Sequence, residues 1–288
     1  MDASPTNTYM FDPESTAELS RLLNQDQLQT QAMGGPFAGL SETEIDGLNN
    51  VLDLGCGPGG WVLDAAFQHS EAEVAGIDIS RPMIDYANAR AQSQGRTNAS
   101  FGVMDITQSL DFADGAFDLV NARYLVGVLS RERWQPLLAE SRRLLRPGGI
   151  LRLTEPIVYP MTTSPAAEAI NRLLHQALWK RGYGFSPDGK TSGDGVSFYL
   201  PRLLRQSGYQ AVKTMPHTLE ISDDTPVWTA FYRNMEVGCL MAKPLLVKMG
   251  VTTEEDFDQL YQQMLIEWNT PGFTGLWHFL TVWGYKPE

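Results

Sequence analysis

The sequence predicts an α/β protein built on a parallel sheet that is covered by helices on both faces. Short apolar runs alternate with helical stretches between residues 51 and 154, which is typical of consecutive βαβ units. A glycine-dense turn follows the first of these runs. Apolar residues make up 43% of the 288 residues and charged residues 19%, a globular composition. A chain near this length can bury roughly three quarters of its unfolded surface, enough for one or two domains.

Residues 1–49 are expected to form an N-terminal helical lid. Asp12 is a suitable N-cap and Pro13 a suitable first helical residue, and three leucines follow at helical spacing. Gly34-Gly35-Pro36 then ends the pattern.

Residues 50–155 carry the alternating pattern and are expected to form the core. The strand-like runs are Val51–Leu54, Val74–Ile77, Phe101–Met104, Phe117–Val120 and Ile150–Leu153. The helical stretches between them are Trp61–Gln68, Arg81–Gln94 and Arg131–Leu145. Ser80 is placed to cap the second of these helices, with Pro82 in its first turn.

The alternation stops after the core, and four further segments are expected. Residues 156–198 form a helix that Ser164-Pro165 opens, followed by a mobile, lid-like loop over 182–197. Residues 199–221 complete the core with a helix and an extended run. Residues 222–275 form a helical cap that includes a helix opened by a Thr252-x-x-Glu255 capping box, and residues 276–288 form a closing strand.

Five of the seven tryptophans lie in these later segments, either as a cap over an apolar cavity or as the core of the cap itself: Trp179, Trp228, Trp268, Trp277 and Trp283.

The net charge of the chain argues against some classes of partner. The chain carries 22 basic and 34 acidic residues, a net charge of −12, which disfavours nucleic acid and anionic membrane surfaces. Two cysteines are too few for a disulfide framework or a zinc cluster, so no metal is expected. With no leader-like start and no long apolar run, we expect a cytoplasmic protein, either a monomer or a homodimer.

The glycine-dense turn, Gly55–Gly60, is the most informative motif. It lies between a strand and a helix, so the backbone can approach a ligand closely while the helix directs its first amides toward it. Asp53 precedes the turn, and a carboxylate there suits a cationic ligand better than a pyrophosphate. Asp78 ends the second strand, where an acid can accept hydrogen bonds from ribose hydroxyls.

These residues resemble the class I S-adenosylmethionine-dependent methyltransferases. DLGCGPG at 53–59 matches the first motif of that family, and GIDIS at 76–80 matches the strand that ends in the ribose-binding acid. The later segments FDLVNARYL and LLRPGGILRLTE match the fourth and fifth strands. The chain is most similar to the ubiquinone- and menaquinone-biosynthesis enzymes and to natural-product methyltransferases. The resemblance implies a Rossmann-like, seven-stranded, mostly parallel sheet with an antiparallel last strand and helical cap insertions.

The resemblance also implies a cofactor, S-adenosyl-L-methionine, with S-adenosyl-L-homocysteine as its product. Met83 and Asp105 would contact the adenine, and Asn121 would lie under the sulfonium. The implied cofactor-binding residues are Tyr9, Asp53, Gly55, Cys56, Gly57, Asp78, Ile79, Met83, Asp105, Ile106 and Asn121. Plain helix packing of Met83 and a strand-end capping role for Asp105 stay open, and Cys56 has no histidine fixed beside it to make it a nucleophile.

The expected activity is methyl transfer to an O, N or C atom of a small, apolar or aromatic acceptor by in-line displacement. Tyr124 and His217 are the catalytic candidates, Tyr124 by closing over the acceptor and His217 as a general base, although packing is the alternative role for any histidine here. Two other functions stay open: a cofactor-binding homologue that catalyses cyclisation or isomerisation, or only binds, and a nicotinamide-dependent oxidoreductase.

Overall fold

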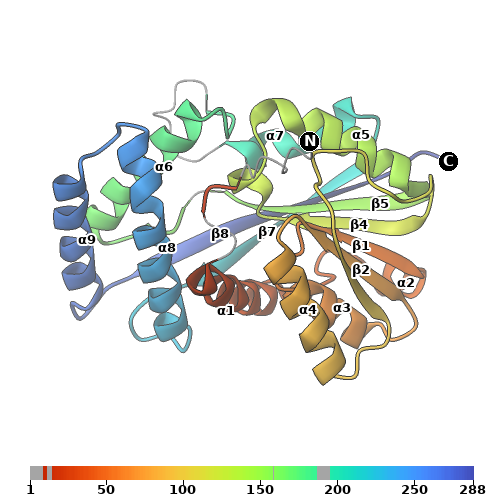
Figure 1. The fold of residues 1–288 in the computed structure, drawn as a ribbon, viewed down its shortest axis with the longest axis horizontal. Coiled ribbons are helices and arrows are strands. Elements are labelled where there is room, and N and C mark those ends of the chain that lie inside the picture. Colours follow the sequence, from red (N-terminus) through yellow and green to blue (C-terminus); the bar gives the residue numbers. More distant parts are fainter. Residues whose placement is uncertain (1–8, 12–14, 158, 187–194) are drawn as a thin grey trace.

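The computed structural model describes residues 9–11, 15–157, 159–186 and 195–288. One sheet crosses the molecule, with strands in the order β3-β2-β1-β4-β5-β8-β6 and with β7 paired to β8 (Figure 1). The strands are β1 Asn50–Leu54, β2 Glu73–Asp78, β3 Ala99–Val103, β4 Phe117–Arg123, β5 Leu145–Pro156, β6 Met161–Thr162, β7 Gln210–Glu220 and β8 Gly275–Tyr285.

The predicted fold class is confirmed. Strands β1 to β5 pair in parallel, and the last strand, β8, runs antiparallel to both β5 and β7. The sheet has one strand more than expected because the two-residue β6 continues the edge that β5 presents to β8. The sequence gives no strand signal over these two residues. They pair with Gly275 and Leu276, and the Thr162 N–H also donates to the Glu168 carboxylate at 3.0 Å.

Helices cover both faces of the sheet and one end of it (Figure 1). The α-helices are α1 Thr16–Met33, α2 Glu42–Asp46, α3 Gly60–Gln68, α4 Arg81–Ser93, α5 Trp134–Leu144, α6 Pro165–Lys180, α7 Val196–Gln206, α8 Trp228–Lys248 and α9 Glu254–Trp268. Two short 3-10 turns are η1 Leu125–Gly127 and η2 Arg131–Arg133.

The core divides along the two faces of the sheet because neighbouring strand residues point to opposite sides. Leu52 and Leu54 pack with α5 and α7 on one face, whereas Val51 packs with α3 on the other. All of these residues are buried, and both faces of the strands are therefore apolar, as expected for a covered parallel sheet.

A separate helical layer of α6, α8 and α9 lies beyond one end of the sheet, at the left in Figure 1. Its own core holds a ring cluster in which Trp228 lies 4.8 Å from Phe273 and 6.3 Å from Trp268, centroid to centroid. Trp228 and Trp268 therefore lie in the core of this helical layer, whereas Trp283 packs in the core beside the sheet. Trp277 lines a cavity.

The helix starts test the sequence predictions closely. Ser80 and Ser164 cap α4 and α6 as expected, each accepting a hydrogen bond from a backbone N–H three residues later. The predicted cap at Thr252 is wrong, because Thr253 caps α9 and accepts from the Asp256 N–H. Helix α7 begins at Val196, about one turn before the predicted start near residue 200. The caps expected at Asp12 and Pro13, and residues 187–194 of the expected mobile loop, lie outside the described residues.

Candidate active site

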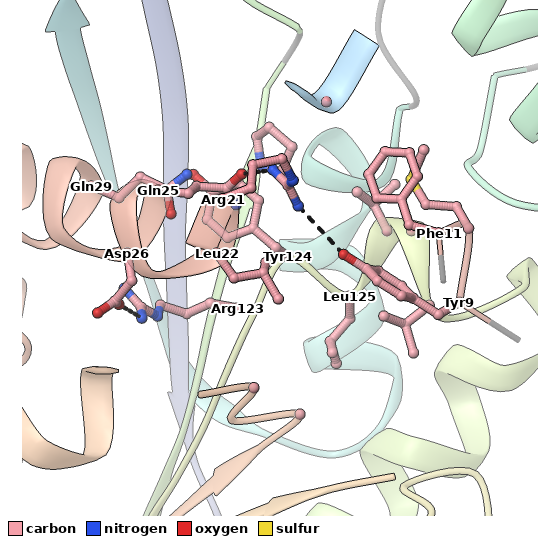
Figure 2. A pocket seen from close by; sticks show the side chains of 18 of the residues that line it. Tyr9, Phe11, Arg21, Leu22, Gln25, Asp26, Gln29, Arg123, Tyr124 and Leu125 are labelled. Carbon is pink, nitrogen blue, oxygen red and sulfur yellow. Dashed lines mark hydrogen bonds and ion pairs between the residues drawn. The ribbon is translucent and has the colours of Figure 1, made fainter. Parts of the chain in front are cut away.

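A cavity of about 260 Å³ lies at the carboxyl ends of β1, β2 and β4, where ligands of open α/β sheets usually bind. Helices α1, α6 and α8 close it, so the cavity runs from the sheet into the helical end layer. Figure 2 shows Asp26 and Gln29 from α1 and Arg123 from β4 on one side of the cavity, with Tyr9 and Phe11 across from them.

The glycine-dense turn forms one wall of the cavity through Gly55 and Gly57. Both residues have left-handed backbones, with φ values of 70° and 52°, which residues with a side chain rarely adopt. The N–H groups of Gly55 and Cys56 both donate to the Ile77 carbonyl, at 2.8 and 2.9 Å. The turn therefore stays close to the end of β2 and presents backbone, rather than side chains, to the cavity.

Asp78 connects the same turn to the start of α4. Its two carboxylate oxygens accept from the Gly57 N–H and the Ser80 N–H, each at 2.9 Å. Burial raises the pKa of Asp78, and these backbone N–H groups partly oppose that shift. Asp78 and Ile79 both line the cavity, so a carboxylate and an apolar side chain lie together at the end of β2.

The next part of the wall comes from the ends of β3 and α4. Met83 is 2% exposed, Ile106 is 7% exposed, and both line the cavity beside Asp105. Asp105 Oδ1 accepts from the Thr107 N–H at 2.9 Å and from the Thr107 hydroxyl at 2.8 Å. Two apolar side chains and a fixed carboxylate make a slot whose chemistry suits a planar ring that carries an amino group.

Asp53 lies at the end of β1 with a row of polar side chains behind it. Its Oδ1 accepts from Asn121 Nδ2 at 2.7 Å, and Asn121 Oδ1 in turn accepts from the Arg152 guanidinium at 2.7 Å. Burial raises the pKa of Asp53 to about 7, although the positive charge of Arg123 and the Asn121 hydrogen bond act to lower it. Asp53 lines the cavity, whereas Asn121 and Arg152 are fully buried behind it.

Both guanidinium groups that line the cavity are neutralised. Arg123 forms an ion pair with Asp26 and donates to the Thr30 hydroxyl at 3.1 Å, which links β4 to α1. Arg21 binds the fully buried Glu18 through two bonds of 2.7 Å. Tyr9 donates its hydroxyl to that same carboxylate and lines the cavity. Each of the two arginine side chains that line the cavity is therefore paired with a carboxylate of the protein.

Tyr124 follows β4 with a left-handed backbone, φ 61°, which is rare for a residue with a side chain. Glu155 holds the turn that follows, because its carboxylate accepts from the Leu125 and Val126 N–H groups at 2.7 and 3.2 Å. The Tyr124 ring lies 6.5 Å from the Trp277 ring and 6.0 Å from the Phe279 ring. Burial raises the pKa of Tyr124 well above its ordinary value, so its hydroxyl stays protonated.

The remainder of the cavity is mostly apolar. Side chains from the N-terminal segment, α6 and α8 form it: Met10, Phe11, Ile170, Leu174, Met235, Cys239 and Ala242. One continuous cavity thus carries carboxylates and a glycine turn at one end and a broad apolar surface at the other.

The structure brings most of the sequence-predicted site residues to this cavity and leaves two away from it. The lining residues include Tyr9, Asp53, Gly55, Cys56, Gly57, Asp78, Ile79, Met83, Asp105, Ile106 and Tyr124. Asn121 lies behind Asp53, since it points from β4 toward Arg152 instead of into the cavity. His217 lies on β7, buried against the Thr281 hydroxyl at 2.9 Å, and it is not among the lining residues.

Sequence reasoning did not single out Asp26, Gln29, Arg123 or Asn234, and it offered Trp277 only as one of five tryptophans that could cap an apolar cavity. Only Arg123 had a usable signal, since it lies two residues after Asn121 on the same strand and so on the same face. No local pattern marks Asp26, Gln29 or Asn234, because they lie on α1 and α8, outside the alternating pattern of the core.

No group of three or more His, Cys, Asp or Glu side chains among the described residues is arranged to hold a metal ion. None of the helices described is long and apolar enough to cross a membrane.

The acceptor groups of the cavity fit the hydrogen-bond donors of a sulfonium nucleoside. Asp78 would accept from ribose hydroxyls and Asp105, between Met83 and Ile106, from an adenine amino group, while Asp53 and the glycine turn would hold an amino acid end. A side chain at position 55 would meet Leu125 at 3.3 Å and would fill this cradle.

Comparisons with known proteins indicate a methyltransferase domain. A family model described as a methyltransferase domain matches residues 51–149. Demethylmenaquinone methyltransferase of Lactococcus lactis is 29% identical over 192 residues, which cover 60% of this chain and 70% of that protein. The probable methyltransferase ltbC of Aspergillus luteorubrus is 31% identical over 166 residues, which cover 48% of this chain and 58% of that protein.

Among solved structures, an N-methyltransferase of Haemonchus contortus in complex with S-adenosylhomocysteine has a TM-score of 0.51 and 17% identity. The match covers 90% of this chain and 53% of that one. At this level of identity the likeness shows the fold alone.

Proposed function

Because residues 51–149 match the methyltransferase-domain family and the chain belongs with the class I S-adenosylmethionine-dependent methyltransferases, we propose that it transfers a methyl group to a small, neutral acceptor with a bulky apolar body. The observation that carries this proposal is the continuity of the cavity. The carboxylates and glycine turn that suit the cofactor open directly onto the apolar side chains of α6 and α8.

At the cofactor end, each group has a separate task in this proposal. Asp78 accepts from the ribose hydroxyls, and Asp105 accepts from the adenine amino group between Met83 and Ile106. Asp53 accepts from the α-ammonium group of the methionine part, beside the backbone of Gly55 and Gly57. When bound, the cofactor supplies an electrophilic methyl group on a positively charged sulfur.

At the acceptor end, charge pairing favours a neutral molecule. An acceptor with a carboxylate or a phosphate needs a free cation, but Arg21 and Arg123 are already paired with Glu18 and Asp26. The acidic net charge of −12 further disfavours nucleic acid. We therefore propose a neutral small molecule as the acceptor.

The chain contributes mainly position and exclusion of water. Holding the acceptor in line with the methyl–sulfur bond can supply about 7–11 kcal/mol of the barrier reduction. Helices α1, α6 and α8 enclose the reacting groups, which keeps water from competing. The described cavity-lining residues include no histidine, and the Tyr124 hydroxyl stays protonated. Tyr124 therefore acts as a hydrogen-bonding group that positions the acceptor, and no base role is assigned to His217.

The test is product formation with purified protein, S-adenosyl-L-methionine and neutral apolar acceptors. Demethylmenaquinone, the acceptor that the name of the Lactococcus relative gives, is the first to screen. Mass spectrometry should show one added methylene on the acceptor and an equal amount of S-adenosyl-L-homocysteine. Asp105→Ala should raise the KM for the cofactor roughly tenfold, because a hydrogen bond to a charged group is lost. The matched change at the exposed Asp111 should have no effect.

Cofactor binding without methyl transfer to any acceptor would instead favour the cofactor-binding homologue. Hydride transfer with a nicotinamide cofactor would contradict the proposal outright.

A further inference from the structure

Seven buried side-chain nitrogen or oxygen atoms have no hydrogen-bond partner among the described residues, and four of them belong to residues that line the cavity. These four are Gln29 Nε2, Tyr124 Oη, Asn234 Oδ1 and Trp277 Nε1. They come from α1, the end of β4, α8 and β8. The other three, Arg96 Nε, Trp268 Nε1 and Trp283 Nε1, belong to residues outside the cavity lining.

We propose that these four atoms, here called the polar tetrad, bind the polar end of the acceptor. The acceptor would then be a neutral molecule whose apolar body ends in a hydrogen-bond-accepting oxygen next to a hydroxyl or N–H donor. This inference rests on the proposed function and adds the substrate class to it.

Trp277 and Asn234 determine which hydrogen-bonding groups the ligand must carry. The indole N–H of Trp277 can only donate, so the ligand must present an accepting atom. Asn234 Nδ2 donates to the Arg21 carbonyl at 2.8 Å, and a carbonyl can only accept, so the orientation of the amide follows from chemistry. Asn234 Oδ1 is therefore left as an acceptor, and the ligand must also present a donor. The Tyr124 hydroxyl can serve either.

The polar tetrad is held in place without its ligand. Trp277 lies 4.9 Å from Phe279 and 6.1 Å from Phe231, ring centroid to ring centroid. Tyr124 packs against Trp277 and Phe279, and the turn after it is bound by Glu155. Gln29 and Asn234 are 1% and 2% exposed. Because these side chains are fixed by packing, a ligand meets a preformed set of polar atoms instead of ordering a loose one.

Because its atoms are buried, the polar tetrad can discriminate between a hydrogen-bonding acceptor and an apolar molecule of the same shape. Leaving a buried polar atom unpaired carries a free-energy penalty, so a ligand that pairs with it gains what an apolar isostere cannot. The matched ion pairs Arg21–Glu18 and Arg123–Asp26 offer no free charge, which disfavours an anionic isostere. Specificity then follows from hydrogen bonding with an uncharged group.

The experiment measures calorimetric binding of three probes to protein saturated with S-adenosyl-L-homocysteine. The probes are 2-naphthamide, which is neutral and carries both an accepting oxygen and N–H donors, 2-naphthoate, its anionic counterpart, and 2-isopropenylnaphthalene, its apolar counterpart. We expect 2-naphthamide to bind at least about tenfold more tightly than either counterpart. Tyr124→Phe and Trp277→Phe should each remove roughly tenfold of that affinity while leaving S-adenosyl-L-homocysteine binding unchanged.

Trp283→Phe is the matched control, because its indole N–H is also buried without a partner but lies outside the cavity lining. It should leave 2-naphthamide binding unchanged. Equal binding of the three probes, no binding of any, or equal losses in Trp277→Phe and Trp283→Phe would overturn the inference. If the unmodified protein does not bind S-adenosyl-L-homocysteine, the proposed function itself is contradicted. Failure of this inference and failure of the proposed function can therefore be told apart.

Discussion

Asp53 is the carboxylate that we propose accepts from the α-ammonium group of the cofactor. Its carboxylate is 4% exposed and accepts from Asn121, and burial keeps its pKa near 7. A buried carboxylate with so high a pKa is costly to ionise unless a cation arrives. An α-ammonium group is such a cation, and its binding should therefore release a proton from Asp53 below neutral pH.

This gives a prediction for pH dependence. Affinity for S-adenosyl-L-homocysteine should rise as pH increases from about 6 toward 7 and then level off, because only ionised Asp53 accepts from the ammonium group. The steepest dependence expected is about tenfold per pH unit. Calorimetric titrations across this range, in two buffers of different ionisation enthalpy, measure both the affinity and the proton release.

Asp53→Asn keeps the shape of the side chain and should flatten that pH profile. A wild-type affinity that stays constant over this range would contradict the role given to Asp53.

The contribution of Asp53 to the free energy of unfolding depends on pH in the opposite direction from that of a salt-bridged acid. The folded pKa is raised, so the contribution of protonated Asp53 is fully present below its unfolded pKa and is lost as pH rises toward about 7.

At the scale of single residues, the sequence predicts which strand-end and turn residues meet in the cavity, because these positions are set locally. Asp53, Gly55, Gly57 and Asp78 follow directly from strand ends and a turn, and all of them line the cavity. His217 shows the limit. Its position on an extended run was foreseeable, but the direction in which it points depends on pairing between β7 and β8, which places it against Thr281.

Among the helices, the start of α9 gives a direct test of capping. Thr252 and Thr253 are neighbours, and each is followed three residues later by an acid, so a capping pattern fits both positions. The structure selects Thr253, whose hydroxyl accepts from the Asp256 N–H at 3.1 Å and donates to the Asp256 carboxylate at 2.7 Å. A one-residue choice of this kind depends on the path of the preceding chain, which the sequence does not reveal.

Thr253→Ala should lower the free energy of unfolding by about 1 kcal/mol, because the N-terminal turn of α9 loses its side-chain acceptor. Thr252→Ala is the matched control and should change it by less than about 0.5 kcal/mol. Urea unfolding curves of the two variants measure the difference. Equal losses, or a larger loss for Thr252→Ala, would contradict the assignment of the cap.

Across the whole molecule, the sheet was predictable and the closing helices were not. The βαβ period sets the order and direction of the core strands, whereas α6, α8 and α9 are recognisable only as helices. Their placement beyond the end of the sheet (Figure 1) comes from tertiary packing of apolar faces and of the Trp228 cluster. For that reason Asn234 could not be identified as a cavity residue from the sequence, and Trp277 could not be told apart from the other four tryptophans of the later segments.

The central claim, that this cavity holds S-adenosyl-L-methionine through Asp78, is tested most directly by thermal melting with S-adenosyl-L-homocysteine or NAD. At ~100 times its Kd, the sulfur nucleoside should add about 2.7 kcal/mol of stability, a rise of several degrees in Tm. Asp78→Ala should abolish that rise, and Asp85→Ala, at an exposed position on α4, should retain it. Stabilisation by NAD alone, or no rise in the unmodified protein with S-adenosyl-L-homocysteine, would contradict the account.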